Sequence, residues 1–85
     1  MIRITPYAEE KLRRRELSRS LVERVTAEPE QLFEEGARKV AQSRYTDTAK
    51  GKEFLLRVIY EESGEDKLVV TAYQTSKIQK YWRPE

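Results

Sequence analysis

The run Phe-Leu-Leu-Arg-Val-Ile-Tyr at residues 54–60 constrains the fold of this 85-residue chain more than any other segment. Its β-branched and aromatic residues favour a strand, and apolar side chains fall on both of its alternating faces. Such a strand has to be covered on both sides, so we expect it in the centre of a sheet. A chain of this length forms one domain with a thin core. The sequence therefore predicts a single domain, residues 1–85, built around one central strand.

Turn-forming residues divide the second half of the chain into further strands. The segments 46–52 and 62–66 contain Asp, Gly, Ser and Thr, which are typical of loops and turns. The segments before and after them have strand composition. We therefore expect an antiparallel β-meander of residues 40–45, 54–60 and 68–73.

The strand register places one arginine on the face away from the helices. Pairing Glu61 with Lys67 puts Arg57 opposite Thr71 and Leu55 opposite Tyr73. The face expected to pack on helices then carries Phe54, Leu56, Val58, Tyr60, Leu68, Val70 and Ala72. The guanidinium of Arg57 lies among apolar and hydroxyl groups on the other face and needs an anionic partner there, either a phosphate or a local carboxylate.

The first half of the chain predicts a short strand at residues 1–5 and two helices. Thr5 followed by Pro6 is typical of a helix start. The second helix is expected to begin at Ser18 or at Ser20, where the sequence matches a capping box, and to end near Glu28. The fold class is therefore α+β, with two helices packed on the antiparallel sheet and a short C-terminal turn or helix at residues 76–82.

The chain contains no histidine and no cysteine. This composition excludes disulfide bonds, the common zinc sites and the Ser–His or Cys–His nucleophile pairs. An enzyme built from it would use carboxylates, Lys, Arg, Tyr or backbone groups, without a metal ion or cofactor. Since no apolar run exceeds about four residues, we expect no membrane segment and a cytoplasmic location.

The net charge of +2 conceals alternating blocks of opposite sign. The blocks are +3 for residues 1–27, −4 for 28–36, +4 for 37–60, −4 for 61–66 and +3 for 67–85. A basic surface with acidic edges suits an anionic partner such as RNA. A surface stabilised by networks of salt bridges would have the same pattern.

Several motifs spread over nearly the whole chain are familiar. They are Tyr7-Ala8-Glu9-Glu10-Lys11-Leu12 with Arg15, Ser18 and Val22 through Glu28-Pro29-Glu30, Gly36 with Arg38, Leu56-Arg57-Val58-Ile59, and Thr71-Ala72-Tyr73-Gln74-Thr75-Ser76-Lys77-Ile78 with Tyr81-Trp82. In these motifs, of which residues 71–82 are the most specific, the chain resembles a bacterial family of small domains of unassigned function, akin to the RelE/BrnT-like toxin superfamily. Tyr7 stands where that family usually has histidine, and Glu16 stands where it usually has glycine.

The resemblance implies a RelE-like fold and a toxin-type, metal-independent ribonuclease that an antitoxin encoded beside it neutralises. Such cleavage needs a base for the 2′-hydroxyl, a cation for the phosphate and an acid for the leaving oxygen. The candidate catalytic residues are Arg57, Tyr73, Lys77, Tyr81 and Tyr7. Because tyrosine is not a base near neutral pH, Tyr7 in place of histidine favours the hypothesis of a non-catalytic binding module over that of a ribonuclease.

The candidate RNA-binding residues are Arg14, Arg15, Arg44, Lys80 and Trp82. The default interpretation of the arginines at the end of the first helix is a solvated face, and the alternative for Trp82 is an aromatic that closes the small core. Three hypotheses follow: a ribonuclease toxin, a non-catalytic module that binds RNA or protein, and a subunit that forms a homodimer through its edge strands.

Overall fold

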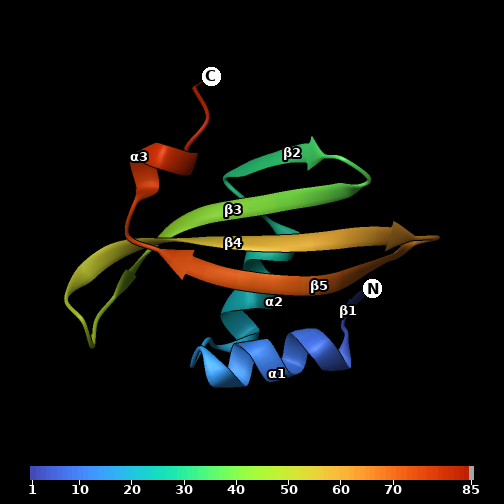
Figure 1. Ribbon diagram of the computed structural model, residues 1–85, viewed down its shortest axis with the longest axis horizontal. Coiled ribbons are helices and arrows are strands. Elements are labelled where there is room, and N and C mark those ends of the chain that lie inside the picture. The colour runs from blue at the N-terminus through green and yellow to red at the C-terminus, as the bar shows by residue number, and fades with distance from the viewer. Residues whose placement is uncertain (85) are drawn as a thin grey trace.

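The computed structural model describes residues 1–84 as one five-stranded sheet with helices on one face and a short helix near the C-terminus (Figure 1). The elements are β1 (Ile2–Ile4), α1 (Pro6–Arg14), α2 (Arg19–Ala27), β2 (Gln31–Glu35), β3 (Arg38–Asp47), β4 (Lys52–Ser63), β5 (Asp66–Thr75) and α3 (Ile78–Tyr81). The strand order is β1-β5-β4-β3-β2, so β4 is the middle strand, as predicted for residues 54–60. In Figure 1, α1 runs along the β5 side of the sheet and α2 crosses behind its middle.

The α+β class is confirmed, but the sheet is mixed and larger than the expected meander. The three predicted strands lie within β3, β4 and β5. β1 pairs in parallel with β5, from Ile2 opposite Lys67 to Ile4 opposite Val69. β2 pairs antiparallel with β3 and was not predicted, because its Glu-rich sequence has little strand character of its own and forms a strand through pairing across the turn at Gly36.

Both helices begin at side chains that accept a backbone N–H. The N–H of Ala8 donates to Thr5 Oγ1 at 3.1 Å, as the Thr-Pro signal predicted. The N–H of Leu21 donates to Ser18 Oγ at 3.2 Å, so α2 begins after Ser18. The capping box at Ser20 was wrong, because that residue already lies inside the helix. No helix of residues 1–84 is long and apolar enough to cross a membrane.

The register between β4 and β5 differs from the predicted one. Glu62, not Glu61, lies opposite Lys67, and Arg57 lies opposite Tyr73 instead of Thr71. Two features cause the difference: a tight turn that pairs Ser63 with Asp66, and an irregularity between Ile59 and Tyr60 that leaves one residue of β5, Val70, without a partner. The bulge turns Val69 towards the helices, where Leu68 and Val70 had been expected, and Val69 is fully buried.

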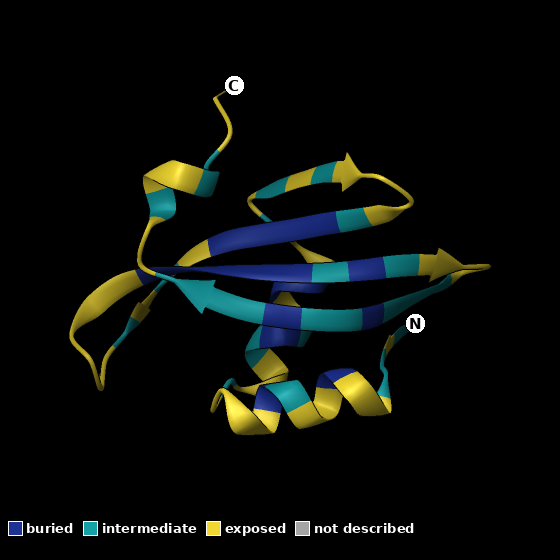
Figure 2. Cartoon of the chain, in the orientation of Figure 1, coloured by how far each residue is buried: buried dark blue, intermediate teal, exposed yellow. Residues whose placement is uncertain are grey.

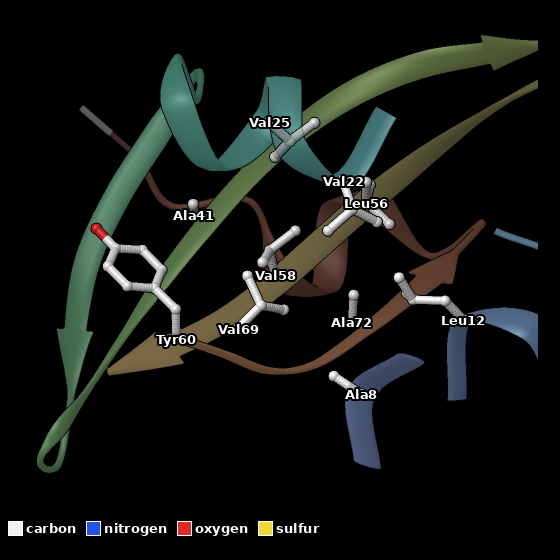
Figure 3. Close-up of a cluster of buried hydrophobic side chains, with 10 residues drawn as sticks. All are labelled: Ala8, Leu12, Val22, Val25, Ala41, Leu56, Val58, Tyr60, Val69 and Ala72. Carbon is white, nitrogen blue, oxygen red and sulfur yellow. The ribbon is translucent and has the colours of Figure 1, made fainter. Parts of the chain in front are cut away.

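The main core lies between the sheet and the two N-terminal helices (Figure 3). Its buried members are Ala8, Leu12, Val22, Val25, Ala41, Leu56, Val58, Tyr60, Val69 and Ala72. Buried residues continue along the middle strands (Figure 2), and Val40 and Leu55 are fully buried outside this cluster. The middle of the sheet is therefore covered on both faces.

We predict that Leu56→Ala lowers the free energy of unfolding by about 2–5 kcal/mol, because it leaves a cavity in the core. Leu56 has no exposed surface, whereas Leu32 is 50% exposed. Leu32→Ala is therefore the matched control and should change the free energy by less than about 0.5 kcal/mol. Chemical denaturation measures both variants. Equal losses would show that the core is not where the structure has it.

Candidate functional site

Most of the candidate residues lie on or beside the sheet face opposite α2, here called the open face. Gln42, Arg57 and Tyr73 are direct neighbours across β3, β4 and β5 on this face. After β5 the chain turns across the sheet and carries α3 towards β2 and β3 (Figure 1). The C-terminal segment, defined as residues 78–84, thereby covers one part of the open face and leaves the part beside α1 uncovered.

Arg57 is a buried cation held by partners within the chain. The residue is only 7% exposed. Its Nε donates to Gln42 Oε1 at 2.9 Å, and its Nη1 donates to the Tyr73 hydroxyl at 2.6 Å. The nearest carboxylate, Glu35, lies 3.9 Å from Nη2 and is itself exposed. Of the two partners that the sequence allowed for Arg57, a phosphate or a local carboxylate, the chain supplies the carboxylate. It also supplies two neutral acceptors, the Gln42 amide oxygen and the Tyr73 hydroxyl.

Aromatic rings surround the guanidinium of Arg57. Its carbon lies 4.5 Å from the ring centroid of Tyr81, 5.7 Å from that of Tyr73 and 5.9 Å from that of Phe33. The rings of Tyr73 and Tyr81 meet edge to face at 6.4 Å. Cation–π attraction is strongest where water is excluded, so this cage stabilises a charge whose nearest carboxylate lies 3.9 Å away. Arg57 thus presents little surface to a ligand and acts by positioning its neighbours.

Two glutamines hold the C-terminal segment against the sheet. Gln42 is fully buried and donates to the carbonyl of Tyr81 at 3.1 Å and to Gln31 Oε1 at 2.7 Å. Gln31 donates to the carbonyl of Arg83 at 2.7 Å and accepts the N–H of Arg83 at 3.1 Å. Sequence reasoning missed both glutamines. No sequence pattern singled them out, because Gln42 is followed directly by the polar residues Ser43 and Arg44.

A second cation–aromatic contact lies beside α3. The guanidinium of Arg44 stacks 4.3 Å from the ring centroid of Trp82 and pairs with the Glu30 carboxylate at 3.1 Å. The hydrogen bonds from Arg44 lower the pKa of Glu30. Lys77 and Lys80 are exposed and line a shallow cleft with Arg44. These residues form a separate group from the network around Arg57.

A pocket between α1 and β5 gathers the remaining candidates. It is lined by Thr5, Tyr7, Lys11, Arg15, Arg38, Val70 and Thr71. Arg15 Nη1 donates to the carbonyl of Ala72 at 2.7 Å and lies 3.4 Å from Thr71 Oγ1. Lys11 Nζ lies 5.1 Å from the centroid of the Tyr7 ring, which is 63% exposed. Arg38 reaches the pocket from β3.

Helical spacing and the bulge in β5 together create this pocket. Tyr7, Lys11 and Arg15 follow one another at intervals of four residues and therefore share one side of the helix. β1 pairs with β5 only as far as Val69, so the following part of the β5 edge is left to α1. The sequence carried this signal in the four-residue spacing, but the contribution of Arg38 required the tertiary structure.

The structure divides the predicted site residues among three places. Arg57, Tyr73 and Tyr81 form the buried network, Lys77, Lys80, Arg44 and Trp82 lie beside α3, and Tyr7 and Arg15 line the pocket. Arg14 joins none of these groups and pairs with Glu10 at 2.9 Å on α1. Since Thr71 and Tyr73 are two strand residues apart, about 7 Å, the pocket lies directly beside the network.

Acidic residues do not gather in a metal-binding arrangement in the described part of the chain. Residues 1–84 contain no group of three or more Asp or Glu side chains placed to hold an ion. Metal independence stays a prediction for any activity of the domain.

We predict that Arg57→Met lowers the free energy of unfolding by about 1–3 kcal/mol, because Gln42 Oε1 loses its buried donor. The C-terminal segment should loosen at the same time, which the fluorescence of Trp82, the sole tryptophan, reports. Arg13→Met removes the same charge from the exposed side of α1 and should cost less than about 0.5 kcal/mol. Unchanged stability of Arg57→Met, measured by denaturation, would refute the anchoring role of this residue.

The chain matches no protein-family model, no curated protein and no solved structure.

Proposed function

We propose that this domain binds single-stranded RNA and holds a phosphate of the strand in the pocket between α1 and β5. One observation carries the proposal: Lys11, Arg15 and Arg38 line a single pocket whose lining includes no carboxylate. Such convergence of cations from separate elements is typical of sites that bind phosphate. The charge blocks of the sequence, basic over α1 and over β3 and β4, support an anionic partner of some length.

The pocket supplies the donors that phosphate oxygens accept. Arg15 is anchored to the β5 backbone through Nη1, so its planar guanidinium is already oriented. The hydroxyls of Tyr7 and Thr71 add neutral hydrogen-bond donors. A phosphate in this pocket would therefore receive charge-assisted hydrogen bonds without a large rearrangement of the fold.

An exposed aromatic beside the pocket favours a single strand over a duplex. Unpaired bases stack on aromatic side chains, and the Tyr7 ring stands open to solvent next to Lys11. RNA is favoured over DNA by the resemblance, most specific over residues 71–82, to a family of small domains of unassigned function that is akin to the RelE/BrnT-like toxin superfamily, whose RelE-like members cleave RNA. Tyr73, half-buried on the same strand as Thr71, offers a second ring along this path.

A second candidate function is metal-independent cleavage of the bound RNA. The Tyr7 hydroxyl shares the pocket with three cations, which would stabilise the charge that develops on a phosphate under attack. The Tyr7 hydroxyl would donate the proton to the leaving 5′-oxygen, and solvent would take the proton that the attacking 2′-hydroxyl loses. With this activity the chain would be the toxin of a pair and would have an antitoxin protein as partner.

The homodimer hypothesis has its candidate edges in β1 and β2, the outer strands of the sheet.

The binding proposal predicts that Arg38→Gln weakens binding of a fluorescent single-stranded oligoribonucleotide about tenfold at low salt and reduces the salt dependence by about one phosphate contact. Arg13→Gln is the matched control. It removes the same charge from α1 but lies on another side of the helix, beside Glu9 and Glu10. Fluorescence anisotropy measures all three proteins. Equal losses in the two variants would show that binding depends on net charge and not on the pocket.

The cleavage proposal predicts that labelled RNA is cut in the presence of EDTA and that Tyr7→Phe slows the cutting about 100-fold or more, since the proton donor is lost. Gel analysis of the RNA over time measures the rate. RNA that is bound but stays intact would leave the domain as a binding module.

A further inference from the structure

We propose that the pocket between α1 and β5 selects a terminal phosphate monoester, so that the domain recognises the phosphorylated end of an RNA strand in preference to its interior. The inference rests on the proposed RNA binding and specifies which phosphate the pocket holds. It follows from the charge of the pocket, from the number of its cations and from the contrast with the cleft beside α3.

The charge of the pocket matches a dianion. Its lining carries three positive charges, from Lys11, Arg15 and Arg38. One carboxylate, Glu61, touches this group through a 2.8 Å contact with Arg38 Nε, which leaves a net charge of +2. A phosphodiester inside a strand has one negative charge, whereas a terminal monoester has nearly two above its second pKa of about 6. The monoester therefore neutralises the pocket and the diester does not.

The number and origin of the cations also suit a monoester. A terminal phosphate has three non-bridging oxygens, whereas a diester has two. The cations reach the pocket from different elements: Lys11 lies on α1, Arg15 follows that helix, and Arg38 belongs to β3. Each oxygen of a terminal phosphate can thus face one cation, and the attached ribose can leave past the exposed Tyr7 ring.

The cleft beside α3 provides an internal comparison. Arg44, Lys77 and Lys80 line it together with the carboxylate of Glu53. Arg44 is also bound to Glu30 through two nitrogen contacts at 3.2 and 3.1 Å. Three positive and two negative charges leave a net +1, which matches an internal phosphodiester. The two cationic surfaces therefore suit different phosphates. Of the two, only the pocket at α1, with its net charge of +2, matches the dianionic phosphate at the end of an RNA strand.

The test compares one short oligoribonucleotide in three forms: with a 5′-phosphate, with a 3′-phosphate and with hydroxyls at both ends. Binding to the full chain is measured by anisotropy at pH 7.0 and low salt. At least one phosphorylated form should bind about tenfold more tightly than the unphosphorylated form, because it adds a charge inside the pocket. Arg38→Gln and Lys11→Gln should remove most of this preference, and Arg13→Gln should retain it.

A pH series separates a monoester effect from a general charge effect. The chain has no histidine, the side-chain type whose charge ordinarily changes near pH 6. The ionisable groups that face the pocket are Tyr7, Lys11, Arg15 and Arg38, with Glu61 beside them. A loss of preference between pH 7.0 and 5.5 therefore reports protonation of the terminal phosphate. A preference that is unchanged at pH 5.5 would contradict the dianion argument.

The outcomes distinguish this inference from the proposed function. Equal binding of the three RNA forms would overturn terminal recognition and leave RNA binding standing, whereas absence of binding to all three would overturn both. A preference that survives both Arg38→Gln and Lys11→Gln, in variants that melt like the parent, would place the selective site elsewhere. Inorganic phosphate or a phosphoserine peptide that binds as tightly as the phosphorylated RNA would also overturn the inference, because the ligand would then not be an RNA end.

Discussion

The positive charge of Arg57 inside the central strand is the constraint on which one side of this domain depends. β4 must be covered on both faces to bury its apolar residues, yet a guanidinium stands in the middle of the open face. A buried cation without close compensation is costly, so its neighbours have to supply acceptors and electron-rich rings. Gln42, Tyr73 and Tyr81 do this, and they come from β3, β5 and α3.

The position of the C-terminal segment follows from the same requirement. An 85-residue chain has too few apolar side chains to cover a five-stranded sheet on two faces with helices. Residues 78–84 cover part of the second face. The backbone of this segment is not paired with a strand, and the side-chain amides of Gln31 and Gln42 donate to its carbonyls instead. Polar side chains thus take the place of a second helical layer over β2 and β3.

At the α1 end of the open face, the structure depends on the edge of β5 that β1 leaves unpaired. Because β1 is only three residues long, the rest of β5 lies beside α1, and Arg15 donates to a backbone carbonyl of that strand. The same arginine belongs to a row of Tyr7 and Lys11 at four-residue spacing, so protection of the edge and a cationic pocket arise together. A structural contact and a candidate ligand site therefore share one side chain, which is why substitution of Arg38 separates the two roles better than substitution of Arg15.

The sequence by itself determined the α+β class, the three long strands, the Thr5 helix start and the need of Arg57 for a partner, because these depend on local periodicity, capping and the chemistry of one buried charge. Only the tertiary structure decided the parallel pairing of β1, the existence of β2 and the bulge at Val70, since each depends on contacts between distant segments and not on local propensity. Together with the tight turn that pairs Ser63 with Asp66, the bulge moved Tyr73 opposite Arg57. The fold divides the predicted site residues among the network around Arg57, the cleft beside α3 and the pocket at α1, because these residues belong to different elements. The register between β4 and β5 required the tertiary structure for a physical reason. Side chains alternate with a period of two in a strand, so one unpaired residue changes which side chains meet, and no pattern in the sequence shows where that residue lies.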